Sequence, residues 1–376
     1  MIIPVMGITG AGKSTFIKQV SGLDVEVGHS LQSCKSFLCL HLHLRTCILT
    51  IARNHVGTSD ITIYSYPHES GKSIYLVDTP GFDDTNKSDT DILEDIANFF
   101  AHIYKGQYPV AGLIYLHKID GNRMQGSARK NLRLLQDICG TKALDSVILA
   151  TTMWDKVALR DGEKNERELV CTEDFWGKMI AVGSKVMRHD SGEASGLRIV
   201  NELMERYNNN NRNSSSSNNS STNSGGRVGG RARAREAPVL QIQKEMVLEK
   251  KLLNQTLAGI SLDGDLEAQA RKHQSEIESL RKEWEQAMSA NDEKWRREVE
   301  DESRAARAKL RRAERSRRNL AVGLEAIEKK SPSGSGWKMA KRVAKYGAVA
   351  AVALATGLFI PLKSPPAAPP SPTVTT

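Results

Sequence analysis

Ten residues near the N-terminus, GITGAGKSTF at positions 7–16, constrain the fold more than any other part of the chain. They contain the pattern GxxxxGK[ST], follow a short apolar run at residues 2–6, and lead into a segment of helical character. Glycines let the backbone turn so that successive N–H groups point at a phosphate, and the N-terminal end of a helix adds positive potential. Because this strand–loop–helix context is the one the pattern requires, the sequence predicts a phosphate-binding loop in an α/β domain.

The loop pattern assigns individual roles. Lys13 is expected to reach the β- and γ-phosphates and to act in catalysis, and Ser14 is expected to bind Mg²⁺. Pro4 lies inside the preceding apolar run, which suits only a strand start or an edge strand. The remaining nucleotide contacts of this segment are predicted for Gly7, Thr9, Gly10, Ala11, Gly12 and Thr15.

A second motif, SIYLVDTPGFDD at residues 73–84, places an acid at the end of an apolar run. Asp78 at the tip of a buried strand can hold the Mg²⁺ shell, and the N–H of Gly81 can sense the γ-phosphate. A plain strand followed by a Pro-Gly turn is the alternative interpretation. The phosphate loop upstream favours the nucleotide-binding one, with Asp78 a metal ligand and Gly81 a catalytic residue.

A third motif, VILATTMWDKV at residues 147–157, carries Thr152 and Asp155 after another apolar run. A carboxylate at Asp155 can accept both N–H groups on one edge of guanine, and a polar site facing the wrong base leaves a buried group unpaired. This favours guanine over adenine, with GTP or GDP and Mg²⁺ as ligands. Strands that alternate with helices, each motif lying at a strand's carboxyl end, predict a largely parallel sheet.

These motifs, GITGAGKS, DTPGFDDT and TTMWDK, together with VEVGHSLQSC at residues 25–34, resemble the septin-related branch of G proteins. That branch includes the immunity-associated (GIMAP-like) GTPases, and the most similar set is a group of fungal G-domain proteins. The resemblance covers residues 1 to about 205. It implies a Ras-like α/β G domain with a mostly parallel central sheet, GTP and Mg²⁺ as ligands, and a homodimer formed through the G domain under nucleotide control.

Two positions, Phe82 and Met153, depart from the common G-protein pattern. Phe82 stands where many small GTPases carry a glutamine that orients the attacking water, so intrinsic hydrolysis is expected to be slow unless a dimer partner or another protein supplies the missing group. Arg123 is a candidate for that group. Met153 replaces the lysine that packs along the base. The last guanine-contacting loop stays open between GSK at residues 183–185 and RHDS at residues 188–191.

Residues 35–57 interrupt the expected switch segment. The resemblance implies a threonine directly after SLQSC, which makes Thr58 the expected switch threonine that closes over Mg²⁺ and the γ-phosphate and takes part in catalysis. We therefore interpret residues 35–57 as an insertion or a retained intron. Their alternating pattern also suits a half-buried strand with Cys39, His41 and His43 on one face, and a metal site there is the weaker alternative.

The rest of the chain divides by composition. Residues 1–207 form the predicted G domain, and the Asn/Ser/Gly-rich run at 208–237 is expected to be a disordered linker. Residues 238–330 have the composition of a charged helix or coiled coil, with a single solvated helix as the alternative. A coiled coil would offer the homodimer a second contact.

The C-terminal segments follow. A basic linker at residues 331–345 precedes an uncharged apolar run at 346–362, and residues 363–376 form a Pro-rich disordered tail. Seventeen residues of helix span roughly 25 Å, short of a hydrocarbon core of roughly 30 Å. The basic linker and the apolar run could attach the protein to an anionic membrane surface. A small helix packed on a partner is the alternative.

The net charge of +9 attracts anionic partners, but the basic residues after the linker alternate with glutamate and lack interleaved aromatics. Nucleic acid is therefore not an expected partner. Five cysteines without CxxC pairs, and no secretory leader, favour a cytoplasmic setting with membrane association through the C-terminus. The sequence thus predicts a slow or partner-activated GTPase switch. A non-hydrolysing, nucleotide-stabilised coiled-coil scaffold is the alternative.

Overall fold

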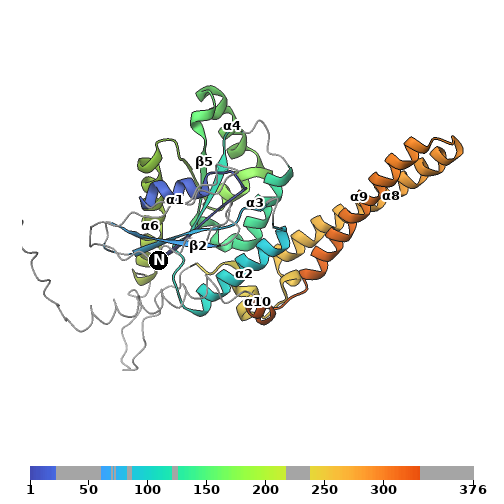
Figure 1. The fold of residues 1–376 in the computed structure, drawn as a ribbon. Coiled ribbons are helices and arrows are strands. Elements are labelled where there is room, and N and C mark those ends of the chain that lie inside the picture. The colour runs from blue at the N-terminus through green and yellow to red at the C-terminus, as the bar shows by residue number, and fades with distance from the viewer. Residues whose placement is uncertain are drawn as a thin grey trace, which may run out of the picture.

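The computed structural model describes residues 1–22, 61–68, 71, 73–82, 87–120, 126–216 and 238–330 (Figure 1). Within these residues the strands are β1 (Ile2–Gly7), β2 (Thr62–Pro67), β3 (Ser73–Asp78), β4 (Leu113–Lys118), β5 (Val147–Thr152) and β6 (Lys185–Arg188). They form one sheet in the order β2-β3-β1-β4-β5-β6. β2 is antiparallel to β3, and the other neighbouring pairs are parallel. The predicted α/β fold with a mostly parallel central sheet is confirmed.

Helices cover both faces of the sheet. They are α1 (Lys13–Ser21), α2 (Asp89–Lys105), α3 (Gly126–Cys139), α4 (Leu159–Cys171), α5 (Lys178–Ala181) and α6 (Gly192–Ser216), with 3-10 turns at Thr141–Ser146 and Trp154–Lys156 and a π turn at Glu173–Gly177. Alternate residues of β1 enter the two cores, because side chains along a strand point to opposite faces. Ile3 and Val5 pack with α1 and α6, and Ile2 and Met6 pack with α2 and α3.

Pro4 lies in the central strand, so the edge-strand interpretation is wrong. Ile2 bridges Val110 just before β4 and Val5 pairs with Ile114, so the segment 110–114 has one residue more than the β1 segment 2–5 between these two pairs. The ladder is therefore bulged opposite Pro4. A bulge is one of the few places where a sheet tolerates a residue without an N–H group.

α6 continues beyond the expected domain boundary. It runs to Ser216, so residues 208–216 are helical and the boundary predicted at residue 207 falls inside a helix. The Asn/Ser-rich composition does not end the helix at residue 207, because asparagine and serine are only mildly unfavourable in a helix whose first half is already packed. The rest of the predicted linker, from residue 217 to 237, lies outside the described residues.

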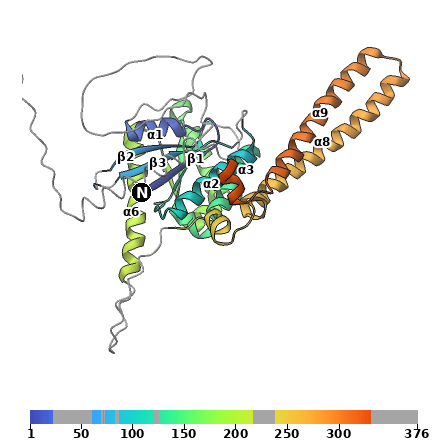
Figure 2. The ribbon, with the colours of Figure 1, turned by 60° about the horizontal axis from the view of Figure 1, so that its bottom comes forward.

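The second half folds as a helical hairpin (Figures 1 and 2). It begins with α7 (Gln241–Gln243), a π turn at Lys244–Leu248 and a 3-10 turn at Leu253–Gln255, and continues with α8 (Leu257–Ser289), α9 (Glu293–Asn319) and α10 (Leu324–Lys330). Asn291 has a φ of 55° between α8 and α9, and the side chain of Asp292 caps α9. α8 and α9 pack against each other in antiparallel directions, so residues 238–330 do not form one continuous helix.

The root of this hairpin belongs to the core of the first domain. Leu253, Leu262 and Leu320 are fully buried and pack in the same cluster as residues of α2 and α3. The buried side-chain amide of Gln243 donates to the carbonyl oxygen of Phe100 at 3.0 Å. The two halves of the chain therefore share one core on this face of the sheet, and the α8–α9 arm projects from it (Figure 2).

Several predicted features lie outside the described residues: the insertion at 35–57, Thr58, Arg123, and the segments 331–345, 346–362 and 363–376. Among the residues that the structure does describe, no helix is both long and apolar enough to cross a membrane. Nor do the described residues contain a cluster of three or more His, Cys, Asp or Glu side chains that could hold a metal ion.

Candidate nucleotide-binding site

The predicted phosphate loop joins β1 to α1 with three glycines at positive φ: Gly7 at 149°, Gly10 at 79° and Gly12 at 88°. Only glycine adopts such angles without strain. At Gly7 the space is closed as well, because a Cβ atom there would lie 2.3 Å from the carbonyl oxygen of Leu116. Gly12 is the N-cap of α1. The backbone N–H groups of the loop therefore lie next to the unpaired N–H groups of the first turn of α1, where an anion can bind.

Lys13 folds back over this loop. Its side chain is buried, and its ammonium group donates to the carbonyl oxygens of Gly7 and Ile8, both at 3.0 Å. The ammonium group is thereby held at the concave side of the loop, where a phosphate would accept from it. Of the other loop residues, Thr9 is exposed and Thr15 lies half-buried on α1.

Ser14 and Asp78 meet at the mouth of the loop. The Ser14 hydroxyl donates to a carboxylate oxygen of Asp78 at 2.7 Å, and Asp78 is 1% exposed at the end of β3. A hydroxyl and a carboxylate side by side are hard oxygen donors, the kind that Mg²⁺ takes alongside phosphate oxygens and water. This donor pair fits the magnesium site that the sequence predicts. Thr58, the third predicted ligand, lies outside the described residues.

Gly81 lies against the phosphate loop. A Cβ atom at this position would come within 2.6 Å of the Thr9 amide nitrogen and 2.9 Å of the Lys13 ammonium nitrogen. The next residue, Phe82, is 4% exposed and packs in the core beneath α2. The Gly81 backbone is therefore beside the phosphate position, whereas the Phe82 ring points away from it and into the protein.

The third motif reaches the same edge of the sheet. The hydroxyl of Thr152, the last residue of β5, donates to the carbonyl oxygen of Ala11 at 2.9 Å, which ties the motif to the phosphate loop. Met153 adopts a φ of 62°, and its methyl carbon lies 3.6 Å from the position a Cβ on Gly12 would take. Asp155 follows in the 3-10 turn with an exposed side chain.

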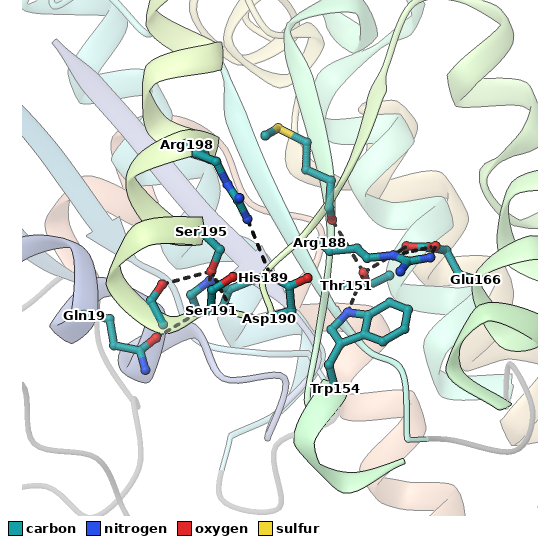
Figure 3. Close-up of polar contacts among 12 residues, drawn as sticks. Gln19, Thr151, Trp154, Glu166, Arg188, His189, Asp190, Ser191, Ser195 and Arg198 are labelled. Carbon is teal, nitrogen blue, oxygen red and sulfur yellow. Dashed lines mark hydrogen bonds and ion pairs between the residues drawn. The ribbon is translucent and has the colours of Figure 1, made fainter. Parts of the chain in front are cut away.

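The loop after β6 completes this edge (Figure 3). His189 donates its backbone N–H to Thr151 at 2.8 Å, and its ring nitrogens contact Gln19 at 2.8 Å and Ser195 at 2.9 Å. Burial lowers the pKa of His189, which favours the neutral ring. The other candidate loop, GSK at residues 183–185, lies at the opposite end of the sheet, where the Ser184 hydroxyl donates to Leu144 just before β5.

One cluster of side-chain contacts at this edge is not predicted from the sequence. The Arg188 guanidinium stacks on the Trp154 ring at 4.3 Å from its centroid, and its Nε and Nη2 atoms both donate to the carboxylate of Glu166 on α4. The Trp154 indole N–H donates to the Thr151 hydroxyl at 3.0 Å. These contacts, visible in Figure 3, fix the turn that carries Asp155. No spacing rule links these residues, because they come from four elements (β5, the 3-10 turn after it, α4 and β6) that meet only in the fold.

Comparison with known proteins adds a description of the fold. No family model and no curated protein sequence matches the chain. Solved structures are similar to part of the chain. One is the bacterial selenocysteine-specific elongation factor EF-Sec, with 16% identity over 56% of this chain and 29% of that one, at a TM-score of 0.37. Another is Toc33 from Arabidopsis thaliana with Mg²⁺ and GMPPNP, with 16% identity over 56% of this chain and 85% of that one, at a TM-score of 0.36.

A third is the G domain of the T. maritima FeoB iron transporter, with 15% identity over 55% of this chain and 98% of that one, at a TM-score of 0.32. The match to the elongation factor covers less than a third of that protein's length. The class of the protein follows from its own sheet order and loop geometry: an α/β phosphate-loop domain of the G-domain type with a helical C-terminal region.

Proposed function

We propose that the protein binds GTP and GDP with Mg²⁺ and acts as a nucleotide-controlled switch. The observation that carries this proposal is the meeting of all three sequence motifs around one loop: Ser14 with Asp78, Gly81 with Lys13, and Thr152 with the Ala11 carbonyl. In this assignment Lys13 and the loop amides bind the phosphates. Mg²⁺, held by the Ser14 and Asp78 oxygens, would offset the charge on the β- and γ-phosphates.

The preference for guanine rests on Asp155. Its exposed carboxylate lies on a turn that is tied to the phosphate loop through Thr152 and held by the stack of Arg188 on Trp154. A fixed carboxylate at this edge can accept from two N–H groups of guanine, and adenine presents no such pair. The resemblance of the motifs to the septin-related branch supports the same base.

Hydrolysis is proposed to be slow or assisted. The side chain after Gly81 is a phenylalanine ring buried in the core, so no side chain at position 82 can orient an attacking water. A second copy of the chain, joined through the G domain, is the proposed source of the missing group. Thr58 is the proposed switch threonine, and the proposed setting is the cytoplasm, with membrane association through the C-terminus.

A non-hydrolysing scaffold is the second candidate, and the hairpin favours it. Its root is part of the same core as α2 and α3, so a nucleotide that stabilises the domain would also stabilise the arm. In this alternative the bound nucleotide serves structure only. The two candidates differ in whether phosphate is released.

The deciding experiment compares the full chain with a version that lacks residues 35–57. Binding of fluorescent GDP and ADP is measured with Mg²⁺, and phosphate release from GTP is then measured at low and high protein concentration. Preferential GDP binding, with release that accelerates at high concentration, supports a dimer-activated GTPase. Guanine binding without release supports the scaffold. Equal affinity for ADP and GDP contradicts the role given to Asp155.

A variant tests the base contact directly. Asp155→Asn removes a charged acceptor of two hydrogen bonds, each worth about 1.5–3 kcal/mol, so GDP affinity should fall about 100-fold or more. Asp161→Asn, an exposed aspartate six residues later in the first turn of α4, is the matched control and should keep GDP affinity within about twofold. Equal losses in both variants would argue against a specific contact.

A further inference from the structure

One side of α9 carries a stripe of arginines. Residues 304, 307, 311, 315 and 318 are all arginine and follow one another at steps of three and four, which places them on one side of a helix. At 1.5 Å per residue the stripe is roughly 21 Å long. All five side chains are exposed. We call this set the arginine stripe.

The stripe is separate from the packing of the hairpin. The buried residues of α9 are Val299, Ala306 and Ala313, on the side of the helix that meets α8. Figures 1 and 2 show that the arm carrying the stripe projects from the sheet domain. A flat or extended partner can therefore approach the arm.

The positive charge of this surface is poorly compensated. Residues 304–318 contain eight basic residues and a single acid, Glu314. Arg317, beside the stripe, pairs with Asp263 at 2.8 Å, and Arg304 reaches Asp301 at 3.4 Å with both groups largely exposed. Within the described part of the chain the other four stripe arginines form no ion pair. An exposed ion pair of the Arg304 kind contributes little.

The stripe borders a groove between α8 and α9. The groove has a volume of about 560 Å³, and its walls include Arg304, Arg307 and Arg311 from α9, and Arg281 and Trp284 from α8. The Trp284 indole N–H donates to Glu300 at 3.1 Å, which leaves the ring along the groove wall. Guanidinium groups bind phosphate through two parallel hydrogen bonds, and tryptophan favours the boundary between apolar and polar surroundings.

We propose that this face of the arm is a docking surface for anionic phospholipid membranes. The occupant follows from charge and from the chain itself. Stripe arginines would contact lipid phosphates, and the basic linker at residues 331–345 followed by the apolar run at 346–362 supplies a second lipid-directed segment. Trp284 is the one aromatic residue among the described residues that line the groove, and one ring does not provide the series of aromatic rings on which single-stranded nucleic acid stacks. The proposal does not depend on which nucleotide the domain binds.

The test uses the full chain and a triple variant, Arg307→Gln, Arg311→Gln and Arg315→Gln. Glutamine keeps helix propensity and removes three charges. The matched control removes three charges from an exposed set on α4 through Arg160→Gln, Lys164→Gln and Arg167→Gln. Co-sedimentation is measured with phosphatidylcholine vesicles that contain or lack phosphatidylserine, and helix content is checked by circular dichroism.

Each basic residue near an anionic surface accounts for about a fivefold change in affinity. The triple variant should therefore bind phosphatidylserine vesicles about 100-fold more weakly than the wild type, and the α4 control should bind within about threefold. Raising the salt should weaken wild-type binding, because the contact is electrostatic. Replacing the same three arginines with lysine keeps the charge and should retain most of the binding, which provides a second variant if the glutamine one fails to fold.

Three results would overturn the proposal. The first is equal vesicle binding by the wild type and the triple glutamine variant. The second is an equal loss in the stripe variant and the α4 control, which would mean that net charge alone matters. The third is release of the wild type from vesicles by substoichiometric single-stranded RNA, with RNA binding lost in the stripe variant, which would assign the surface to nucleic acid.

Discussion

Acidification should destabilise this protein through one buried histidine, His117. It lies on β4 with 8% of its surface exposed, and its ring meets the edge of Trp176 at 5.9 Å between centroids. Burial lowers the pKa of His117 from 6.5 to about 4, with a further lowering by the nearby charge of Lys118 and an opposing effect of Asp120. The neutral ring is therefore the form that the folded protein accepts.

The sign and size of the effect follow from this pKa. Between pH 6.5 and about 4 the unfolded chain binds a proton at this position that the folded protein does not. The stabilising contribution is complete above about pH 6.5 and is lost as the pH falls through this window. One pKa unit corresponds to ~1.4 kcal/mol, so the full loss is ~3 kcal/mol, of which ~2 kcal/mol is gone by about pH 5.

Urea unfolding at pH 8 and at pH 5, for the wild type and His117→Gln, measures this contribution. Carboxylates that titrate at low pH affect both proteins alike and cancel in the comparison. The free energy of unfolding should fall by ~2 kcal/mol more in the wild type than in the variant. An equal fall in the two proteins would refute the reasoning, because it would show that His117 takes up a proton equally well in the folded and unfolded states.

Three further substitutions test other contacts. Gly81→Ala places a Cβ atom 2.6 Å from the Thr9 amide nitrogen, so the phosphate loop must shift. In a fluorescence titration the variant should bind a GTP analogue about tenfold more weakly, relative to GDP, than the wild type does. Leu262→Ala opens a cavity at the fully buried hairpin root and should lower the stability of the whole chain by about 3 kcal/mol in one cooperative urea transition; a separate, unshifted transition of the sheet domain would contradict the shared core. Asp292→Ala removes the cap that accepts from two α9 amides and should cost about 1 kcal/mol by thermal unfolding, with no change in nucleotide affinity.

The phosphate loop and the sheet were predictable because their signals are local. Gly7, Gly10 and Gly12 stand where the backbone needs positive φ, and the apolar runs before Asp78 and Thr152 are short strands that end at the same edge. Each signal lies within about a dozen residues. A fold in which parallel strands direct their carboxyl ends to one edge then brings the motifs together.

The hairpin of α8 and α9 was not predictable from local sequence patterns of this kind. Apolar residues at steps of three and four occur both before and after Asn291, and this periodicity is the same whether a helix pairs with its own neighbour or with a second chain. The signals that mark the turn are Asn291, which tolerates positive φ, and Asp292, which suits an N-cap.

The shared core links the nucleotide site to the arm physically. α2 begins shortly after Gly81, and the Thr90 hydroxyl in its first turn donates to the Ser316 carbonyl of α9 at 3.4 Å, while Lys105 at its end pairs with Glu328 of α10 at 2.7 Å. A ligand present at 100 times its dissociation constant stabilises the fold it binds by about 2.7 kcal/mol. Because the hairpin root cannot unfold without exposing the core beneath α2 and α3, that stabilisation extends to the root of the arm, whether or not the nucleotide is hydrolysed.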